Sequence, residues 1–241
     1  MLVKTKAVVL RTIKYGDSRM IVDLLTEQVG RLGCIVTVPK TARGRNKKQL
    51  YQPMTLLDIE FDQRPQADLQ RIRDVRIAVP YLSIPFDTYK LPTALFLSEF
   101  LYYATRGEQQ NSALYAFVET SMQWLDAAQK PVSNFHLVFM IHLAQFIGFF
   151  PNLDDYHEGD LFDLRSASFV TNQPLHADYV PTQEASYLLQ LMRMNYATMH
   201  LFRFSREQRN HILQLLLDYY RLHVPAFPEL HSTAVVQELF V

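Results

Sequence analysis

The chain has 241 residues, of which 49% are hydrophobic and 20% are charged, so it can bury a substantial core and is unlike a disordered protein. It has 24 Lys and Arg and 24 Asp and Glu, and this zero formal net charge taken alone argues against a nucleic-acid-binding protein. The single cysteine, Cys34, excludes an internal disulfide framework and an all-cysteine zinc site, and it fits a reducing cytoplasm.

The balanced total conceals a division along the chain. Residues 1–80 contain 15 Lys and Arg against 8 Asp and Glu, whereas residues 81–241 contain 9 against 16. This asymmetry predicts a basic module followed by an acidic one.

Five stretches of β-type sequence occupy the basic module, and turn residues separate them. Branched side chains and the alternation of apolar with polar residues predict strands at 3–12, 20–26, 32–38, 55–61 and 69–79. Several short strands in so short a segment are typical of a closed barrel, because closure removes the exposed strand edges. We therefore expect a five-stranded oligonucleotide-binding (OB) barrel at residues 1–80.

A loop rich in positive charge follows the third predicted strand, in a region without Asp or Glu between Glu27 and Asp58. Uncompensated cations beside aromatic rings are suited to neutralising phosphates and stacking on bases. Of the candidate rings Tyr15, Tyr51 and Phe61, we assign Phe61 to the core, because it continues the apolar face of its strand. The expected DNA contacts are Arg11, Arg31, Lys40, Arg43, Arg45, Lys47, Lys48 and Tyr51.

Helical patterns replace the strands after residue 87, which predicts an α+β fold with a helical domain at residues 81–241. The first helix should end near Gly107, and the next should begin at Asn111 or Ser112. The other predicted helices cover residues 133–148, begin at 181–182, and begin at Ser205, which forms a capping box with Gln208. The apolar tail at 232–241 could dock on its own domain or contact a partner.

A polar, proline-bounded insertion at residues 151–181 interrupts the helices, and a hairpin is predicted at 162–170. Its acidic stretch carries Asp154, Asp155, His157, Glu158 and Asp160. These side chains could in principle bind a hard cation, but they lack the spacing of a calcium loop. His136 and His142 lie off the four-residue spacing of a helical zinc pair. We predict no metal, no cofactor and no catalytic residue.

Several short motifs together resemble the bacterial recombination mediator family RecO. They are AVVLR at residues 7–11, YGDS at 15–18, LT at 25–26, GRL at 30–32 and QPMTLL at 52–57. The resemblance extends over essentially the whole chain, although its specific part is residues 5–60.

This resemblance implies an amino-terminal OB barrel followed by a helical domain. It further implies binding of single- and double-stranded DNA, annealing of complementary strands, and work with RecR to load RecA onto DNA coated by single-strand-binding protein. The C-terminal tail of single-strand-binding protein is an implied partner, with its site in the helical domain. Many relatives hold zinc with four cysteines in the insertion, which this chain lacks, so a cysteine-free, zinc-ribbon-like insertion is expected at 151–181.

Three functions compete on the sequence. The favoured one is a non-enzymatic DNA-binding and strand-annealing mediator, because no phosphate-binding Walker loop, dinucleotide fingerprint or nucleophile elbow occurs. The alternatives are a metal-dependent nuclease that uses the acidic residues at 154–163 and a protein-only adaptor whose basic loop meets an acidic partner. The longest apolar stretch, 137–150, is too short to span a membrane, so we expect a soluble cytoplasmic protein. The resemblance to RecO implies that this protein is associated with the nucleoid.

Overall fold

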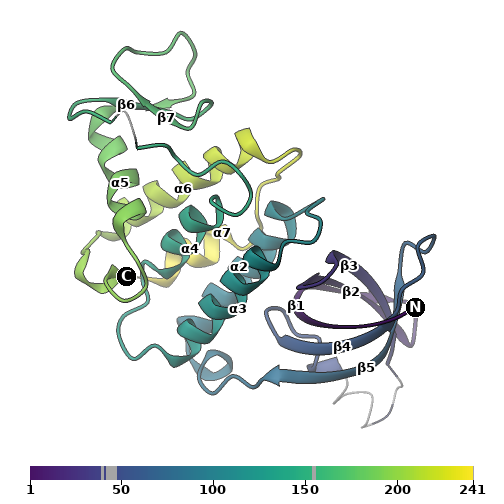
Figure 1. Cartoon of the computed structure of the whole chain (residues 1–241). Helices are drawn as coiled ribbons and strands as arrows, with labels where there is room; N and C mark the ends of the chain where they lie inside the picture. Colours follow the sequence, from purple (N-terminus) through teal and green to yellow (C-terminus); the bar gives the residue numbers. More distant parts are fainter. Residues whose placement is uncertain (39–40, 42–47, 154–155, 241) are drawn as a thin grey trace. The chain divides into compact units, whose positions relative to one another are not determined.

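The computed structural model describes residues 1–38, 41, 48–153 and 156–240, and Lys40, Arg43, Arg45 and Lys47 lie outside this described part (Figure 1). The chain forms two compact units, Met1–Ala127 and Ala128–Val241. No helix among the described residues is long and apolar enough to cross a membrane.

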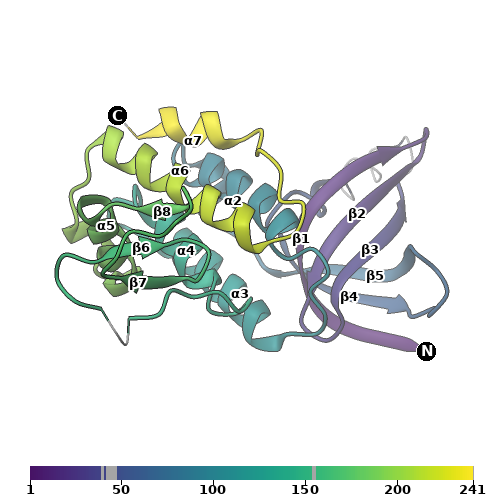
Figure 2. The ribbon, with the colours of Figure 1, turned by 90° about the horizontal axis from the view of Figure 1, so that it is seen from above.

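The first unit begins with a closed barrel, which confirms the expected architecture (Figure 2). Its strands are β1 (Leu2–Tyr15), β2 (Arg19–Thr26), β3 (Gly30–Thr37), β4 (Leu56–Asp62) and β5 (Gln70–Val79). Neighbouring strands follow the order β1-β2-β3-β5-β4, and β4 pairs with β1 to complete the circle. All pairings are antiparallel except the one between β3 and β5.

The long strand β1 pairs with two neighbouring strands. Residues 2–8 pair with β4, and residues 7–15 pair with β2. A bulge between Val9 and Arg11 shifts the register of the second pairing, and such bulges bend a strand and increase its twist. The sequence pattern predicts an end at Thr12, which is three residues too early.

Apolar side chains from alternate strand positions fill the barrel. Its buried set is Val3, Ala7, Val9, Met20, Val22, Leu24, Cys34, Val36, Tyr51, Leu57, Ile59 and Phe61. Phe61 therefore lies in the core, as predicted. Burial raises the pKa of the Cys34 thiol to about 12, so this cysteine stays protonated and unreactive near neutral pH.

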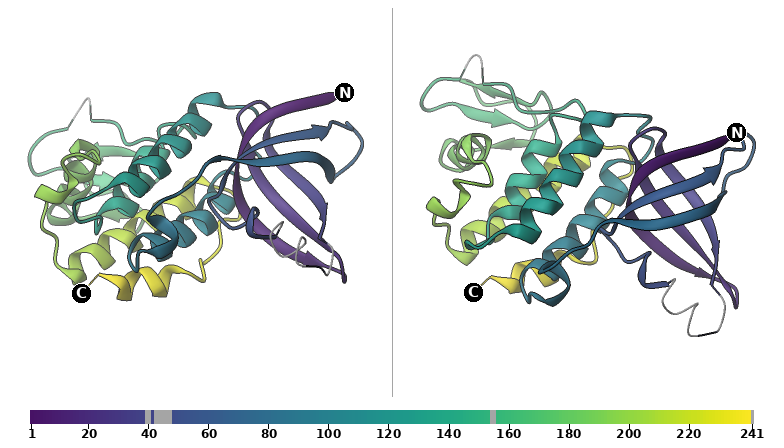
Figure 3. Two further views of the ribbon diagram at one scale, coloured as in Figure 1. Left: turned by 90° about the horizontal axis from the view of Figure 1, so that it is seen from below. Right: turned by 60° about the horizontal axis from the view of Figure 1, so that its bottom comes forward.

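A short helical turn and two helices complete the first unit: η1 (Ile84–Phe86), α2 (Lys90–Ala104) and α3 (Ser112–Ala127). α2 and α3 lie side by side (Figure 3). α2 contacts the barrel at β1, where Ser98 Oγ donates a hydrogen bond of 2.5 Å to the carbonyl oxygen of Leu10. Asn111 Oδ1 accepts a hydrogen bond from the backbone N–H of Leu114, so Asn111 caps α3 as expected.

The second unit contains helices and a small antiparallel sheet. Its elements are α4 (Phe135–Leu143), β6 (Leu161–Asp163), β7 (Ser168–Val170), β8 (Tyr179–Val180), α5 (Thr182–Arg193), η2 (Met199–Leu201), α6 (Arg206–His223) and α7 (Thr233–Leu239). α4 is shorter than the predicted helix at 133–148, because separate turns follow it as far as Gly148. The capping box of α6 is confirmed by reciprocal hydrogen bonds of 2.8 and 3.1 Å between Ser205 and Gln208.

The insertion forms a sheet in the order β7-β6-β8. The sequence predicts the hairpin of β6 and β7 but not β8, because the two residues of β8 are too few to give a periodic pattern. Phe162 packs against Phe169 and Tyr219, with ring centroids 4.9 and 5.9 Å away. These aromatic contacts join the insertion to α6.

The carboxy-terminal tail contacts its own unit. Arg206 Nε and Asn210 Nδ2 both donate hydrogen bonds to the carbonyl oxygen of Gln237. Arg209 donates to the carbonyl oxygen of Phe240, whose ring stacks on His136. Of the two arrangements that the sequence leaves open, the structure shows docking on α6 and α4.

Gly30 offers a test of the junction between the barrel and the end of α2. It has a φ of +70°, and a Cβ atom there would lie 2.5 Å from the carbonyl carbon of Gln109. We expect Gly30→Ala to lower the free energy of unfolding by about 2–5 kcal/mol, since left-handed backbone and a backbone clash both oppose the new methyl group.

Gly16 is the matched control, because it has a φ of +67° and a Cβ atom added there would meet no atom within 4 Å. Gly16→Ala should therefore cost only about 1–2 kcal/mol, the strain of the left-handed backbone alone. Urea unfolding of both variants measures the difference. Equal losses would show that the clash at Gly30 is not a constraint on the fold.

Candidate nucleic-acid interface

A cavity of about 290 Å³ lies at one end of the barrel. Its walls come from the end of β1, the turn that joins β1 to β2, the start of β2, and Val38 directly after β3. Lys48, in the helical turn that precedes Tyr51, completes the lining. The mouth of a small barrel is a common place for ligand binding.

Strand register places part of this lining. Lys14 is paired with Met20 across the β1–β2 hairpin, so both point to the same face, whereas Arg19 is paired with Tyr15 beside the turn. The backbone N–H of Val38 donates a hydrogen bond of 2.8 Å to the carbonyl oxygen of Ser18, which joins the end of β3 to the hairpin turn. The cavity is thus built on hydrogen-bonded backbone.

Three cations line this cavity, Lys14, Arg19 and Lys48, together with one carboxylate, Asp17. None of the three cations forms an ion pair with another residue in the described part of the chain. All three side chains belong to exposed residues. Their positive charge is therefore available to an anionic ligand.

Other cations of the barrel have carboxylate partners. Lys4 pairs with Glu60 at 2.6 Å, Arg73 with Asp62 at 2.6 Å, and Arg76 with Asp58 at 3.1 Å. Lys6 pairs with Glu119 of α3 at 3.0 Å, and this hydrogen-bonded carboxylate raises the pKa of Lys6. Lys4, Lys6, Arg73 and Arg76 thus carry compensated charge, unlike the cations of the cavity.

The structure separates the predicted DNA contacts into groups. Lys48 lies in the cavity, whereas Lys40, Arg43, Arg45 and Lys47 are outside the described residues. The sequence reasoning does not identify Lys14 and Arg19. Their position on both sides of the Gly16 turn is the signal that could have found them, because a tight hairpin brings its flanking residues together.

Arg31 has a structural role that the sequence does not predict. Its guanidinium donates hydrogen bonds to the Tyr102 carbonyl oxygen at 2.8 Å and to Thr105 Oγ1 at 3.0 Å, at the end of α2. A cation there also complements the negative end of the helix dipole. Burial lowers the pKa of Arg31. These hydrogen bonds give Arg31 a structural role at the end of α2, and its expected DNA contact stays a prediction.

Arg11 lies on the same tyrosine. The guanidinium carbons of Arg11 and Arg31 are each 4.9 Å from the centroid of the Tyr102 ring, a distance suited to cation–π attraction. Arg11 is exposed, so it remains available to solvent and to a ligand.

Tyr51 also differs from its expected role. It is only 1% exposed and belongs to the barrel core, so its ring cannot stack on a base in this structure. Its carbonyl oxygen accepts a hydrogen bond of 2.7 Å from Thr12 Oγ1, which ties the chain after Lys48 to β1. Tyr15 is 53% exposed and is the accessible ring among the three that the sequence singles out.

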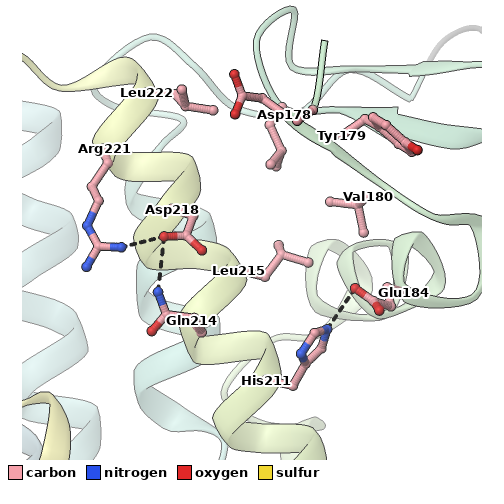
Figure 4. A pocket seen from close by; sticks show the side chains of 12 residues that line it. Asp178, Tyr179, Val180, Glu184, His211, Gln214, Leu215, Asp218, Arg221 and Leu222 are labelled. Atoms are coloured by element: carbon pink, nitrogen blue, oxygen red, sulfur yellow. Dashed lines mark hydrogen bonds and ion pairs between the residues drawn. The ribbon is translucent and has the colours of Figure 1, made fainter. Parts of the chain in front are cut away.

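A second cavity, of about 410 Å³, lies in the second unit between β8, α5 and α6 (Figure 4). Its carboxylates have partners: Asp178 pairs with Arg165 at 2.6 Å, and Glu184 hydrogen-bonds to His211 at 2.8 Å. Asp218 accepts hydrogen bonds from Arg221 and Gln214 (Figure 4). Because its positive groups are already engaged by carboxylates, this cavity is a poor phosphate site.

The acidic insertion is only partly described, since Asp154 and Asp155 lie outside the described residues. Asp160 is buried, and its carboxylate accepts a hydrogen bond of 2.8 Å from the backbone N–H of His157. No three potential metal ligands come together in the described part of the chain. Asp160 therefore stabilises a local turn.

Known proteins match the whole chain. The family model for the Recombination protein O N terminal matches residues 1–81, and the model for the Recombination protein O C terminal matches residues 85–233. Proteins named DNA repair protein RecO are 47% identical in Bacteroides fragilis over 241 residues and 45% identical in Phocaeicola vulgatus over 240 residues. A relative of the same name in Porphyromonas gingivalis is 32% identical over 248 residues, and each comparison covers 100% of both chains.

The contacts of Arg31 lead to a stability prediction. Arg31→Ala removes two charge-assisted hydrogen bonds from the end of α2, so we expect the free energy of unfolding to fall by about 1.5–3 kcal/mol. Arg11→Ala is the matched control, because it removes contact with the same ring but no hydrogen bond seen among the described residues. It should cost about 1 kcal/mol or less. Urea unfolding distinguishes them, and a larger loss for Arg11→Ala would contradict the assigned role.

Proposed function

The chain belongs to the RecO family of DNA repair proteins, and we propose that it is a recombination mediator that binds and anneals DNA through its barrel. The proposal combines the family membership with a cavity at the barrel mouth whose cations lack carboxylate partners among the described residues. Contact with phosphates is insensitive to sequence, which suits a protein that must act wherever DNA is damaged.

The observation that carries this proposal is the contrast between two sets of cations on the barrel. Lys14, Arg19 and Lys48 are unpaired among the described residues, whereas Lys4 and Arg76 are neutralised by carboxylates. A phosphate approaching the cavity gains attraction, because no ion pair must first be broken there. The basic residues of the sequence between Val38 and Lys48 would add to this field.

Strand annealing needs no catalytic group. Complementary strands form a duplex spontaneously once their phosphates can approach, and bound cations reduce the repulsion between them. We therefore propose a non-enzymatic activity, without a nucleotide or metal requirement. The acidic balance of residues 81–241 would oppose DNA in the second unit and leave it to the barrel.

Family membership also supports proposed partners. We expect the chain to act with RecR and to help load RecA on DNA coated by single-strand-binding protein. The C-terminal tail of single-strand-binding protein would dock on the helical part, while the barrel holds single- or double-stranded DNA. A protein with these partners would work at the nucleoid in the cytoplasm.

We expect the purified chain to accelerate annealing of complementary oligonucleotides in the presence of EDTA and without nucleotide. Loss of fluorescence from a dye and quencher on the two strands measures the rate. Incubation with Mg²⁺ and labelled DNA serves as the opposing test. Cleavage that Asp160→Asn leaves intact but Asp154→Asn abolishes would favour the nuclease alternative.

The basic loop has its own prediction. Neutralising Arg43, Arg45, Lys47 and Lys48 to Gln should flatten the salt dependence of single-strand binding. If the four contact one phosphate each, parent affinity between 50 and 200 mM salt falls about 50-fold more than that of the variant. Fluorescence anisotropy measures both affinities, and parallel salt curves would remove these four residues from the DNA interface.

A further inference from the structure

We propose that the cavity of the second unit binds a short segment of a partner protein that carries Lys or Arg together with leucine-type side chains. The cavity is lined by β8, α5, α6 and the residues beside β6 and β8, all of which belong to the second unit. This inference goes beyond the proposed DNA binding, which is assigned to the barrel.

One face of α6 forms a long wall of the cavity. Its lining residues lie three or four positions apart, which places them on the same side of the helix. They include His211, Leu215, Asp218 and Leu222, so polar and apolar side chains alternate along the wall (Figure 4). At a rise of about 1.5 Å per residue the wall is about 16 Å long, the length of roughly five residues of extended chain. It therefore suits a peptide segment.

Three carboxylates of the lining can each accept a further hydrogen bond. The hydrogen bonds that Asp178, Glu184 and Asp218 already make all end on one oxygen, which is Oδ2, Oε2 and Oδ1 respectively. The second oxygen of each group has no hydrogen-bond partner among the described residues. These side chains are 35%, 38% and 48% exposed, so an N–H donor of a partner can reach them.

The positive groups of the lining are already engaged. Arg221 donates to Asp218, and His211 hydrogen-bonds to Glu184. A Lys or Arg of a partner can join these groups without breaking them, because a carboxylate accepts several hydrogen bonds at once. A negatively charged segment would instead meet three carboxylates. Charge complementarity therefore selects a basic partner.

A single metal ion does not match this arrangement. In the part of the chain that the structure describes, no three possible ligands are close enough to hold one ion together. The positive charges of the ligand must therefore be spread along it, as they are in a basic peptide.

Apolar side chains lie among the charged groups of the cavity. Val180 and Leu215, which are 3% and 7% exposed, point toward each other from β8 and α6 (Figure 4). Leu222 is 41% exposed and extends this apolar surface. The aliphatic stem of a Lys or Arg and a neighbouring leucine can cover such a surface while the charged group reaches a carboxylate.

The test measures the binding of three labelled nine-residue peptides to the full chain by fluorescence anisotropy. The first repeats Lys-Leu-Ser, the second repeats Lys-Ser-Ser, and the third repeats Glu-Leu-Ser. The first carries both features of the proposed ligand, the second lacks the apolar side chains, and the third has the opposite charge.

Two triple variants of the second unit have the same change in net charge. The cavity variant combines Asp178→Asn, Glu184→Gln and Asp218→Asn. The control combines Glu158→Gln, Glu229→Gln and Glu238→Gln, three exposed carboxylates without an ion pair among the described residues. Circular dichroism and urea unfolding show whether each variant is folded. Leu222→Ser is a further variant, and it decides alone if the cavity variant does not fold.

The parent should bind the Lys-Leu-Ser peptide at least about tenfold more tightly than the Lys-Ser-Ser peptide, because only the first covers the apolar wall. The cavity variant should lose affinity for it on the order of tenfold, and the control should stay within about threefold of the parent. Leu222→Ser should weaken the Lys-Leu-Ser peptide by about fivefold and leave the Lys-Ser-Ser peptide nearly unchanged.

Four outcomes would overturn the inference. Equal losses in the cavity variant and the control would mean general attraction to acidic surface. Equal affinities for the two Lys peptides would remove the apolar contact. Tightest binding of the Glu-Leu-Ser peptide would reverse the charge of the ligand. Displacement of the Lys-Leu-Ser peptide by spermidine at an equal concentration of charge would make a small polyamine the ligand. None of these results bears on DNA binding, which the annealing assay measures separately.

Discussion

The barrel and its mouth depend on one shared strand, β1. Its first half closes the barrel against β4, and its second half continues with β2 alone, beyond the bulge at Val9. Beyond Val8, β1 no longer pairs with β4, and the segment that precedes β4 contacts it instead. Met54 N–H donates a hydrogen bond of 2.7 Å to the carbonyl oxygen of Val9, and Thr12 Oγ1 donates one to the carbonyl oxygen of Tyr51. The second half of β1 also carries Lys14, so the strand that closes the barrel also positions a residue of the cavity.

Some cations of the barrel have carboxylate partners, and others have none among the described residues. Where strands and helices must pack, cations are matched with carboxylates, as in the contact of Lys6 with Glu119. Arg31 is engaged in a different way, by the carbonyl end of α2. Surface ion pairs contribute little to the stability of a fold, about 0–1 kcal/mol, but they reduce the positive potential that would attract a polyanion. The cavity differs because three cations without a described carboxylate partner, Lys14, Arg19 and Lys48, line one site.

Local pattern predicts most of the fold. Alternation and turn residues indicate five strands, and the caps at Asn111 and Ser205 indicate helix starts, because these signals depend on neighbours within a few residues. The site is less predictable. Arg31 finds its acceptor at Tyr102, about seventy residues away, and charge alone cannot indicate such a partner. Tyr51 resembles a surface ring beside a basic loop, but the barrel holds its ring in the core.

An annealing protein must bind a strand and also surrender it to a complementary strand. Contacts with bases would oppose the second step, because each base would have to leave its stacking or hydrogen-bonding partner before pairing. Contacts with the backbone avoid this conflict, since the duplex retains the same phosphates. Under the proposed function, barrel cations such as Lys14 and Arg19 would hold a strand through its phosphates in this way. The dependence of such contacts on charge means that the proposed affinity would fall as salt rises, so release would need no chemical energy.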